Sequence, residues 1–147
     1  MNNHPIIIER IINVPAAKVW EAITDKNKMR KWYFDLPEFN AKTGFKFQFT
    51  GGPNPERQYL HLCEVTEVIH GKKLSYSWRY DGYPGNSFVT FELSEKGHNT
   101  TLLKLTHKDI ETFSSENADF ARENFVEGWD EIVNISLTEY LEPLKNY

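Results

Sequence analysis

The chain has 147 residues, which is the size of a single domain with one hydrophobic core. Its net charge of −4 gives no electrostatic reason to expect a nucleic acid or an anionic membrane surface as partner. No apolar run approaches the roughly 20 residues of a membrane-spanning helix, and the N-terminus is not that of a signal peptide. Cys63 is the single cysteine, so we expect no internal disulfide and a reducing cytoplasmic location for one domain, residues 1–147.

The first part of the chain predicts one strand and two short helices. The β-branched run IIIERIINV, residues 6–14, is typical of a strand. Pro15 then takes a first-turn position in a helix over residues 15–24. The apolar face of that helix carries Ala16, Val19, Trp20 and Ile23. Asp25 is expected to cap a second short helix, residues 25–34, with an apolar side of Met29, Trp32 and Tyr33.

Residues 44–110 change to the two-residue alternation that is typical of β-strands. The expected strands are residues 44–52, 57–69, 72–80, 86–95 and 99–110. Turn signals separate them at Gly51-Gly52-Pro53, His70-Gly71, residues 81–86 and Gly97. Tight connections between successive strands predict an antiparallel sheet.

The C-terminal part predicts one long amphipathic helix. We expect Ser114 or Ser115 to cap it, and Pro143 to prevent its continuation beyond about Leu141. The side expected to face the sheet carries Ala118, Phe125, Trp129, Ile132, Ser136 and Tyr140. The opposite side carries Glu116, Asp119, Glu123, Glu127, Asp130 and Glu131. Gly128, beside Trp129, costs about 1 kcal/mol against alanine in a helix and is expected to admit a close neighbour.

These elements predict the fold class. A sheet with one apolar face must cover that face, and the long helix is the element available to do so. We therefore expect an α+β fold: a curved antiparallel six-stranded sheet wrapped around the long C-terminal helix, with two short helices after the first strand.

Large rings with polar tips dominate the expected inner face of this fold. Aromatic residues make up 14% of the chain, and polar tips need partners when they are buried. A ring-lined wall with a few placed polar groups is typical of a small-molecule pocket, although plain core packing also explains it. The candidate ligand-binding residues are Trp32, Phe47, Tyr59, His61, Tyr76, Trp78, Phe91, Leu105, His107, Phe125, Trp129 and Ile132.

Other kinds of site have weaker support from the sequence. His61 and Cys63 share a strand face that His107 can join, but this is not the spacing of a zinc site. A Cys63–histidine nucleophile would lack an oxyanion-hole loop and an orienting acid. Proton transfer by His107 or a tyrosine is the enzymatic alternative. We therefore expect no metal, no cofactor and no assigned catalytic residue.

Three polar segments have two interpretations each. Residues 51–55, GGPNP, contain no nucleotide-binding pattern and are either a hairpin loop or a flap over a cavity mouth. The basic residues of KNKMRKW, residues 26–32, are either an exposed helix side or an attraction for an anionic partner. The acidic side of the long helix is either solvated or a docking surface for a basic partner.

Several motifs, taken in chain order, resemble the START-like superfamily, also called SRPBCC or Bet v-like. VPAAKVWEAITDKNKMRKWY is similar to its opening pattern P-x-x-x-V-W-x-A-x-T-D, which a later Trp follows. CEVTEV, KKLSYSW, TTLLKLTH and NFVEGWDEI resemble the branch homologous to the C-terminal domain of the heat-shock-protein-90 ATPase activators. The resemblance spans essentially the whole chain.

The resemblance implies a helix-grip fold with a hydrophobic cavity between the sheet and the C-terminal helix. By position, the family's recurring aromatic and histidine positions around that cavity match Trp32, Trp78, His107 and Trp129. Members bind lipids, hormones, polyketides or other hydrophobic molecules, and some catalyse cyclisation or hydrolysis. We expect this single domain to lack the additional N-terminal domain of the eukaryotic activators.

The leading hypothesis is a cytoplasmic binding protein for a hydrophobic small molecule, such as a lipid, a polyketide or an aromatic compound. One alternative is a co-chaperone-like or regulatory module that docks on a chaperone or another protein. The other is an enzyme of cyclase or hydrolase type that uses the same cavity.

Overall fold

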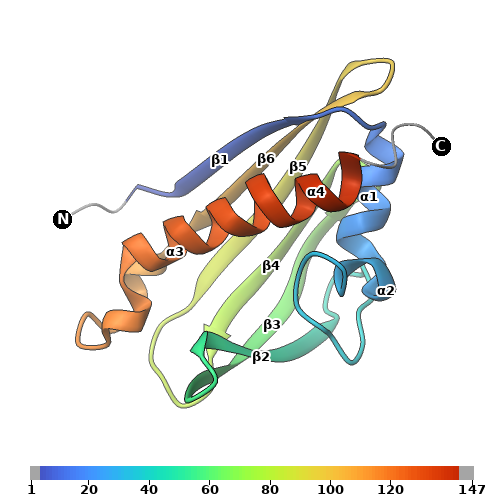
Figure 1. Ribbon diagram of the computed structural model, residues 1–147. Coiled ribbons are helices and arrows are strands. Elements are labelled where there is room, and N and C mark those ends of the chain that lie inside the picture. The colour runs from blue at the N-terminus through green and yellow to red at the C-terminus, as the bar shows by residue number, and fades with distance from the viewer. Residues whose placement is uncertain (1–3, 143–147) are drawn as a thin grey trace.

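The computed structural model describes residues 4–142, which form one six-stranded antiparallel sheet with helices on one side (Figure 1). The strands are β1 (Ile6–Ile12), β2 (Lys46–Asn54), β3 (Arg57–Ile69), β4 (Lys73–Tyr80), β5 (Ser87–Gly97) and β6 (Thr100–Lys108). Their order across the sheet is β1-β6-β5-β4-β3-β2. The first strand therefore pairs with the last, and β1 and β2 form the two edges.

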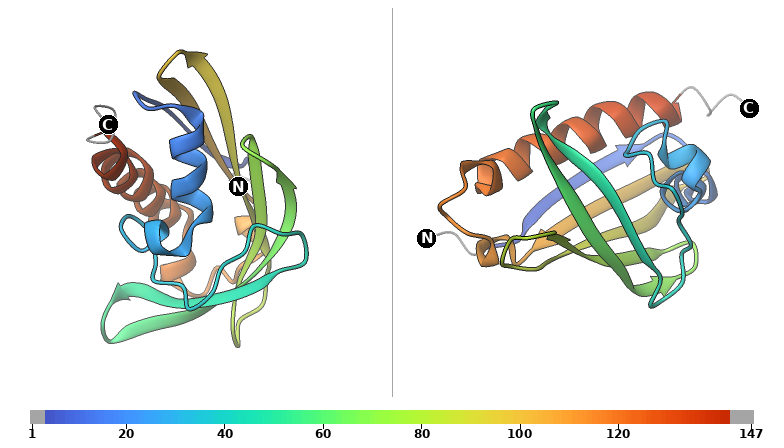
Figure 2. Two further views of the ribbon diagram at one scale, coloured as in Figure 1. Left: turned by 90° about the vertical axis from the view of Figure 1, so that its right-hand side faces the viewer. Right: turned by 90° about the horizontal axis from the view of Figure 1, so that it is seen from below.

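The sheet is strongly curved, and the C-terminal helix lies along its concave side (Figures 1 and 2). Alternate residues point to this side, and in β4 they are Leu74, Tyr76, Trp78 and Tyr80, all buried. The predicted α+β helix-grip fold is confirmed. None of the helices within residues 4–142 combines the length and apolar character that a membrane crossing requires.

The helices α1 (Ala16–Thr24) and α2 (Lys26–Met29) connect the two edges of the sheet. The predicted cap is present, because the Asp25 carboxylate accepts hydrogen bonds from the backbone N–H groups of Asn27 and Lys28. The helix that it caps is shorter than predicted, so Trp32 lies beyond it. The Trp32 indole N–H donates to the Ala22 carbonyl at 2.8 Å, which fixes this segment against α1.

The C-terminal helix consists of α3 (Arg122–Trp129), the π-helical segment η3 (Asp130–Leu137) and α4 (Thr138–Leu141). Its buried core residues are Phe125, Trp129, Val133, Leu137 and Leu141. The predicted inward face with Ile132, Ser136 and Tyr140 was wrong by one residue, because Val133, Leu137 and Leu141 are the fully buried side chains. Ile132, Ser136 and Tyr140 are half-buried, and Ile132 and Tyr140 pack against the core from its edge. A π-helix closes hydrogen bonds between residues five apart instead of four, so each turn is wider and the inward face advances by one position.

The predicted helix start was also wrong. Ser114 and Ser115 do not cap the helix, which begins at Arg122 after two 3-10 turns, η1 (Ile110–Thr112) and η2 (Ala118–Phe120). Short polar side chains bond to nearby backbone here: Ser114 accepts from the Glu116 N–H, and Asn117 from the Asp119 N–H. Ala118 is exposed instead of inward-facing. The predicted stop at Pro143 lies outside the described residues.

The Gly51-Gly52-Pro53 segment is strand, not the predicted turn, because β2 continues to Asn54. The turn lies at residues 54–57, where the Asn54 side chain accepts from two backbone N–H groups. The glycines instead allow close approach. A Cβ at Gly51 would lie 2.8 Å from the Phe34 ring, and one at Gly52 would overlap the Arg57 carbonyl oxygen.

Candidate functional site

The candidate residues lie where the concave face of the sheet meets the C-terminal helix. Those that are buried are Trp32, Phe47, His61, Tyr76, Trp78, Phe91, Leu105, His107, Phe125 and Trp129. Tyr59 and Ile132 are only half-buried, and Val133 takes the inward position predicted for Ile132. The buried set forms part of one continuous core, which we call the ring-lined interior.

Trp129 connects the helix to the sheet through a chain of hydrogen bonds. Its indole N–H donates to His107 Nδ1 at 2.9 Å. His107 Nε2 lies 2.8 Å from the Ser87 hydroxyl, which donates to the Trp78 carbonyl oxygen at 2.8 Å. Because Nδ1 accepts, the ring proton of neutral His107 is on Nε2, and every bond in the chain has a defined direction.

His107 is held neutral and has no free nitrogen. Burial lowers the pKa of His107 to about 3, since a charged imidazolium would lose its hydration. Both ring nitrogens are already hydrogen-bonded, so neither is available to take a proton from a substrate. The geometry therefore gives His107 the role of holding Trp129 in position. It does not make His107 available as the general base that the enzymatic alternative assigned to it.

His61 is packed among rings at the neighbouring part of the interior. It stacks on Phe49 with ring centroids 4.4 Å apart, and contacts Trp78 and Tyr80 edge-on at 4.8 Å each. Its Nδ1 donates to the Tyr59 carbonyl at 3.0 Å. Burial lowers the pKa of His61 to about 4, so this histidine is also neutral near pH 7.

Tyr76 forms the polar contact at the middle of the interior. Its hydroxyl lies 2.6 Å from that of Tyr33, and burial raises the pKa of both tyrosines. Tyr33 in turn stacks on Trp129 at 6.2 Å. Tyr33 and its neighbour Phe34 come from the irregular segment after α2, so this segment adds rings to the wall between helix and sheet.

Polar contacts join the tip of β3 to η2. The Tyr59 hydroxyl donates to Asp119 Oδ2 at 2.6 Å, and the Arg57 guanidinium binds both Asp119 oxygens at 3.1 and 3.2 Å. Asn117 Nδ2 donates to the same Tyr59 hydroxyl at 3.3 Å. We call these four residues the Asp119 cluster: Arg57, Tyr59, Asn117 and Asp119. Asp119 therefore does not belong to the solvated acidic side on which it was predicted.

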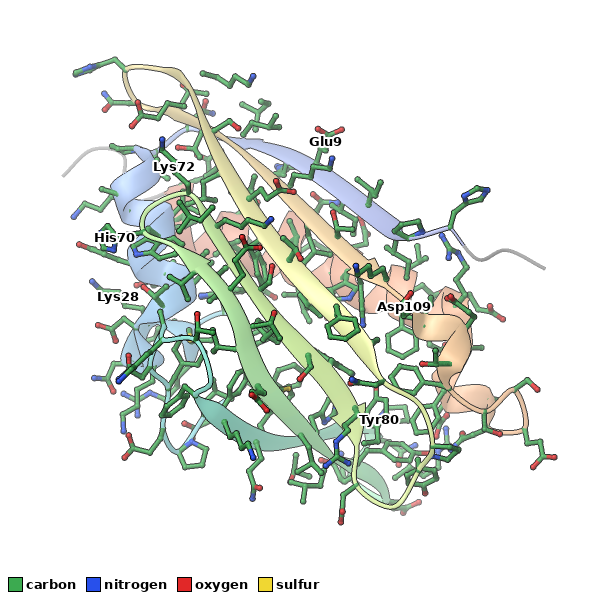
Figure 3. The ribbon with its side chains drawn as sticks, turned by 180° about the vertical axis from the view of Figure 1, so that it is seen from behind. Glu9, Lys28, His70, Lys72, Tyr80 and Asp109 are labelled. Atoms are coloured by element: carbon green, nitrogen blue, oxygen red, sulfur yellow. The ribbon has the colours of Figure 1, made fainter. Side chains whose placement is uncertain are left out.

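A second group of rings closes the interior behind the Asp119 cluster. Phe120 stacks on Tyr80 at 4.3 Å and contacts Tyr59 at 5.0 Å and Tyr83 at 5.2 Å. Phe113, which follows η1, packs on Tyr80 at 5.1 Å. Figure 3 shows Tyr80 and Asp109 at the same end of the sheet, away from His70 and Lys72.

Sequence reasoning missed several rings of this wall. Tyr33, Phe34, Phe49, Phe113 and Phe120 were not among the candidate residues, although all contact one or more of them. Phe49 continues the alternation of Phe47 and was detectable. Tyr33 was expected on the apolar side of the second short helix, but that pattern did not indicate a place in the wall. Phe34, Phe113 and Phe120 lie in segments without a repeating pattern, where the sequence gives no direction for their rings.

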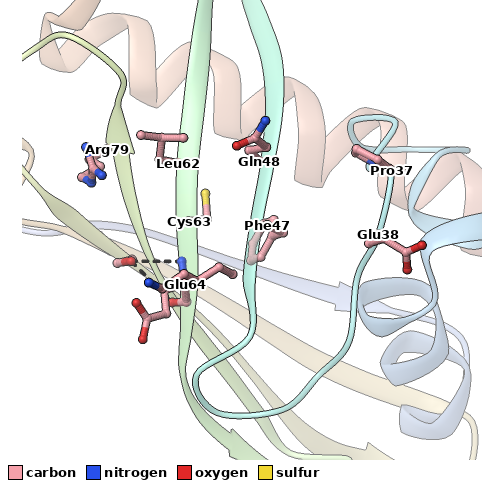
Figure 4. Close-up of a pocket in the computed structure, with 10 residues that line it drawn as sticks. Pro37, Glu38, Phe47, Gln48, Leu62, Cys63, Glu64 and Arg79 are labelled. Carbon is pink, nitrogen blue, oxygen red and sulfur yellow. Dashed lines mark hydrogen bonds between the residues drawn. The ribbon is translucent and has the colours of Figure 1, made fainter.

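The surface formed by residues 4–142 has a groove and a second hollow, and neither of these lies between the helix and the centre of the sheet. A groove of about 430 Å³ crosses the convex face of the sheet beside Pro37 and Glu38 (Figure 4). Its strand positions include Lys46, Glu64 and Arg79, and backbone of Phe47 and Cys63 borders it. A second hollow of about 510 Å³ is lined by Tyr83, Pro84, Ser114, Glu116, Asn117 and Ala118.

Metal ligation and thiol chemistry gain no support from the geometry. Within residues 4–142, no three His, Cys, Asp or Glu side chains gather as a metal site would require. Burial raises the pKa of Cys63, which keeps it a thiol. Among the described residues, no strand or side chain approaches Gly128 closely, because a Cβ built there meets no atom outside its own helix backbone within 4 Å.

Comparisons with known proteins agree with this architecture. CalU16 from Micromonospora echinospora superposes with a TM-score of 0.73 and 26% identity, over 95% of this chain and 77% of its own. An Hsp90 activator from Plasmodium falciparum, PFC0360w, gives 0.71 and 24%, over 98% and 97%.

DynU16, a protein of the dynemicin biosynthetic locus, superposes with a TM-score of 0.75 and 21% identity. The similarity covers 96% of this chain but only 48% of DynU16. A search of curated proteins gives no match. The sequence profile of the activator of Hsp90 ATPase homolog 1-like proteins matches residues 13–142, and the chain belongs to that family.

Proposed function

We propose that this protein binds a hydrophobic, ring-containing or acyl small molecule between the sheet and the C-terminal helix, in the cytoplasm. The observation that carries the proposal is a continuous path of rings from the surface to the interior. Tyr83, which is 42% exposed, lines the 510 Å³ hollow and contacts the Tyr59 ring at 5.5 Å. From Tyr59 the path continues through Tyr80 and His61 to Trp78.

Opening of the segment Ile110–Phe120 would make room for the ligand. Its only regular structure is the pair of short 3-10 turns η1 and η2, so few backbone hydrogen bonds hold it. The partly exposed Asp119 cluster joins it to β3. Segments of this kind open locally at a small fraction of the global unfolding free energy. A ligand that replaces the Phe120 contacts would bury apolar surface worth roughly 25 cal/mol per Å².

The candidate residues of the ring-lined interior would form the wall of this site, with Trp78 and Trp129 at its centre. His107 and Ser87 would keep Trp129 in place through their hydrogen bonds. DynU16, which shares the fold, belongs to a biosynthetic locus, and this is consistent with a small-molecule role.

Native mass spectrometry of protein purified from its own cells tests the proposal. We expect a co-purifying compound that is lost on denaturation. A thermal-shift panel of neutral and acidic lipophiles should include a stabilising ligand, with a variant such as Phe120→Asp abolishing the shift. An empty protein together with a panel that gives no shift would refute small-molecule binding.

A protein partner is the second candidate function, and the outer side of the C-terminal helix favours it. Glu123, Glu127, Asp130 and Glu131 are exposed there. Two exposed apolar side chains, Val126 at 41% and Ile135 at 48%, stand among them. A basic partner such as a chaperone would dock on this side. Charge reversal of Glu123 and Glu127 should then remove a partner from a pull-down, and an unchanged set of partners would count against this role.

A further inference from the structure

The Trp78 indole N–H is a buried donor without an acceptor. Trp78 is 5% exposed, and its Nε1 makes no hydrogen bond within the described residues. Burying a polar group without a partner costs about 1–3 kcal/mol, and most buried polar atoms are paired for this reason. By contrast, the indole N–H groups of Trp32 and Trp129 are both bonded.

The polar neighbours of Trp78 do not accept a hydrogen bond from its N–H. His107 uses both of its nitrogens in other bonds, and His61 bonds through Nδ1 to the Tyr59 carbonyl. Tyr80 is the polar neighbour on the same strand face. Burial raises the pKa of the Tyr80 hydroxyl and the Trp78 N–H acts against this rise, so the two groups are near each other. They nevertheless lack hydrogen-bond geometry, so the Trp78 N–H is unpaired.

The rings that contact Trp78 carry no formal charge. They are Phe49, His61, Tyr80, His107 and Trp129. Both histidines are neutral because burial lowers their pKa values. A carboxylate placed here would meet donors but no cation, and the cost of stripping its hydration would remain. The chemistry that fits is a neutral acceptor on an apolar ring.

We propose that the ligand of the ring-lined interior is a neutral, flat ring compound with a carbonyl oxygen that accepts a hydrogen bond from Trp78 Nε1. This inference rests on the proposed function and names the class of compound for that site. An unpaired donor of this kind would select a ketone over a hydrocarbon of equal shape.

Fluorenone and fluorene are suitable probes, because they share a ring system and differ in the carbonyl group. We expect the protein to bind fluorenone about tenfold more tightly than fluorene, as one added hydrogen bond allows. In Trp78→Phe this preference should fall to less than twofold. The ratio between the two ligands cancels any change in ring packing that the substitution causes. Trp20→Phe, in α1 and outside the site, should keep the tenfold preference.

An NMR measurement on the unaltered protein covers the case in which Trp78→Phe fails to fold. Fluorenone should move the Trp78 indole N–H resonance downfield, and fluorene should not. Equal binding of both probes with no selective shift would overturn the carbonyl inference and leave hydrophobic binding intact. Failure of both probes to bind would overturn the inference together with the proposed function.

Discussion

Gly128 offers a direct test of whether the space beside the C-terminal helix is empty. We expect Gly128→Ala to stabilise the ligand-free protein. A Cβ added there meets no atom outside its own helix backbone within 4 Å, and the φ angle of Gly128 does not lie in the left-handed region. Only the helix propensity changes, which favours alanine by about 1 kcal/mol. For a chain of this length, that gain corresponds to a melting-temperature rise of about 2–4 °C.

Urea unfolding followed by far-UV circular dichroism measures this effect, and two other glycines serve as controls. Gly71 also has nothing within 4 Å of an added Cβ, but its φ is +77°. Gly71→Ala should therefore destabilise the fold by about 1–2 kcal/mol through backbone strain alone. Gly85→Ala should cost more, because its φ is +107° and the added Cβ would lie 2.6 Å from the Thr112 carbonyl oxygen.

A loss of stability in Gly128→Ala would refute the reasoning, since it would mean that something occupies the space. The same variant reports on binding. If a ligand or partner fills the gap beside Trp129, the alanine should weaken that interaction while it stabilises the free protein. Unchanged affinity would place the occupant elsewhere.

Three further predictions concern the helix register, the buried histidines and the Asp119 cluster. Leu137→Ala should lower the free energy of unfolding by about 2–5 kcal/mol, and Ser136→Ala by much less, because Leu137 is fully buried and Ser136 is not. Equal costs would contradict the π-helical register. His61 and His107 have pKa values lowered to about 4 and about 3, so the unfolded chain binds more protons between those values and about 6.5. Their contribution to the free energy of unfolding is thus present above pH 6.5 and is lost on acidification, by roughly 4 kcal/mol at pH 5 for both histidines together. Urea unfolding at pH 7 and pH 5 measures this loss. His61→Gln should halve it, and an undiminished loss would contradict the lowered pKa of His61. Asp119→Asn should cost no more than about 1 kcal/mol globally, since Arg57 is largely exposed, but should speed amide hydrogen exchange in Ile110–Phe120. Unchanged exchange there would show that this cluster does not hold the segment closed.

Strand positions were predictable from the sequence because their signal is local. A period of two places Phe47 and Phe49 on one face whatever the rest of the chain does, and the structure has both buried. The same holds for Tyr76, Trp78 and His107. For these residues, the sequence predicted the side of the sheet correctly, and therefore the membership of the interior.

The second half of the C-terminal helix was not predictable in the same way. The expected inward set assumed 3.6 residues per turn, and η3 departs from that value between Asp130 and Leu137. The sequence offers Ile132 and Val133 side by side, and both are good core residues. Which one packs depends on the sheet beneath, so the choice belongs to tertiary structure.

The Asp119 cluster shows a different limit. Arg57 and Asp119 are far apart in sequence, and they were expected at the start of a strand and on the acidic side of the long helix, with no signal that joins them. Their pairing needs the curvature of the sheet, which brings the β3 tip to η2.

The hydrogen-bond chain through His107 links the helix register to the unpaired Trp78 N–H. Trp129 is the last residue before η3, and its N–H must meet His107 Nδ1 to satisfy two buried groups at once. The Ser87 hydroxyl then accepts a hydrogen bond from His107 Nε2–H and donates its own hydrogen to the Trp78 carbonyl. The backbone carbonyl of Trp78 therefore has a partner, while its indole N–H has none. Both His107 nitrogens and the Trp78 carbonyl are thus used by structural bonds, whereas the Trp78 indole N–H is left for a ligand oxygen. The preference for a ketone over the matching hydrocarbon, measured with and without Trp78, tests this assignment directly.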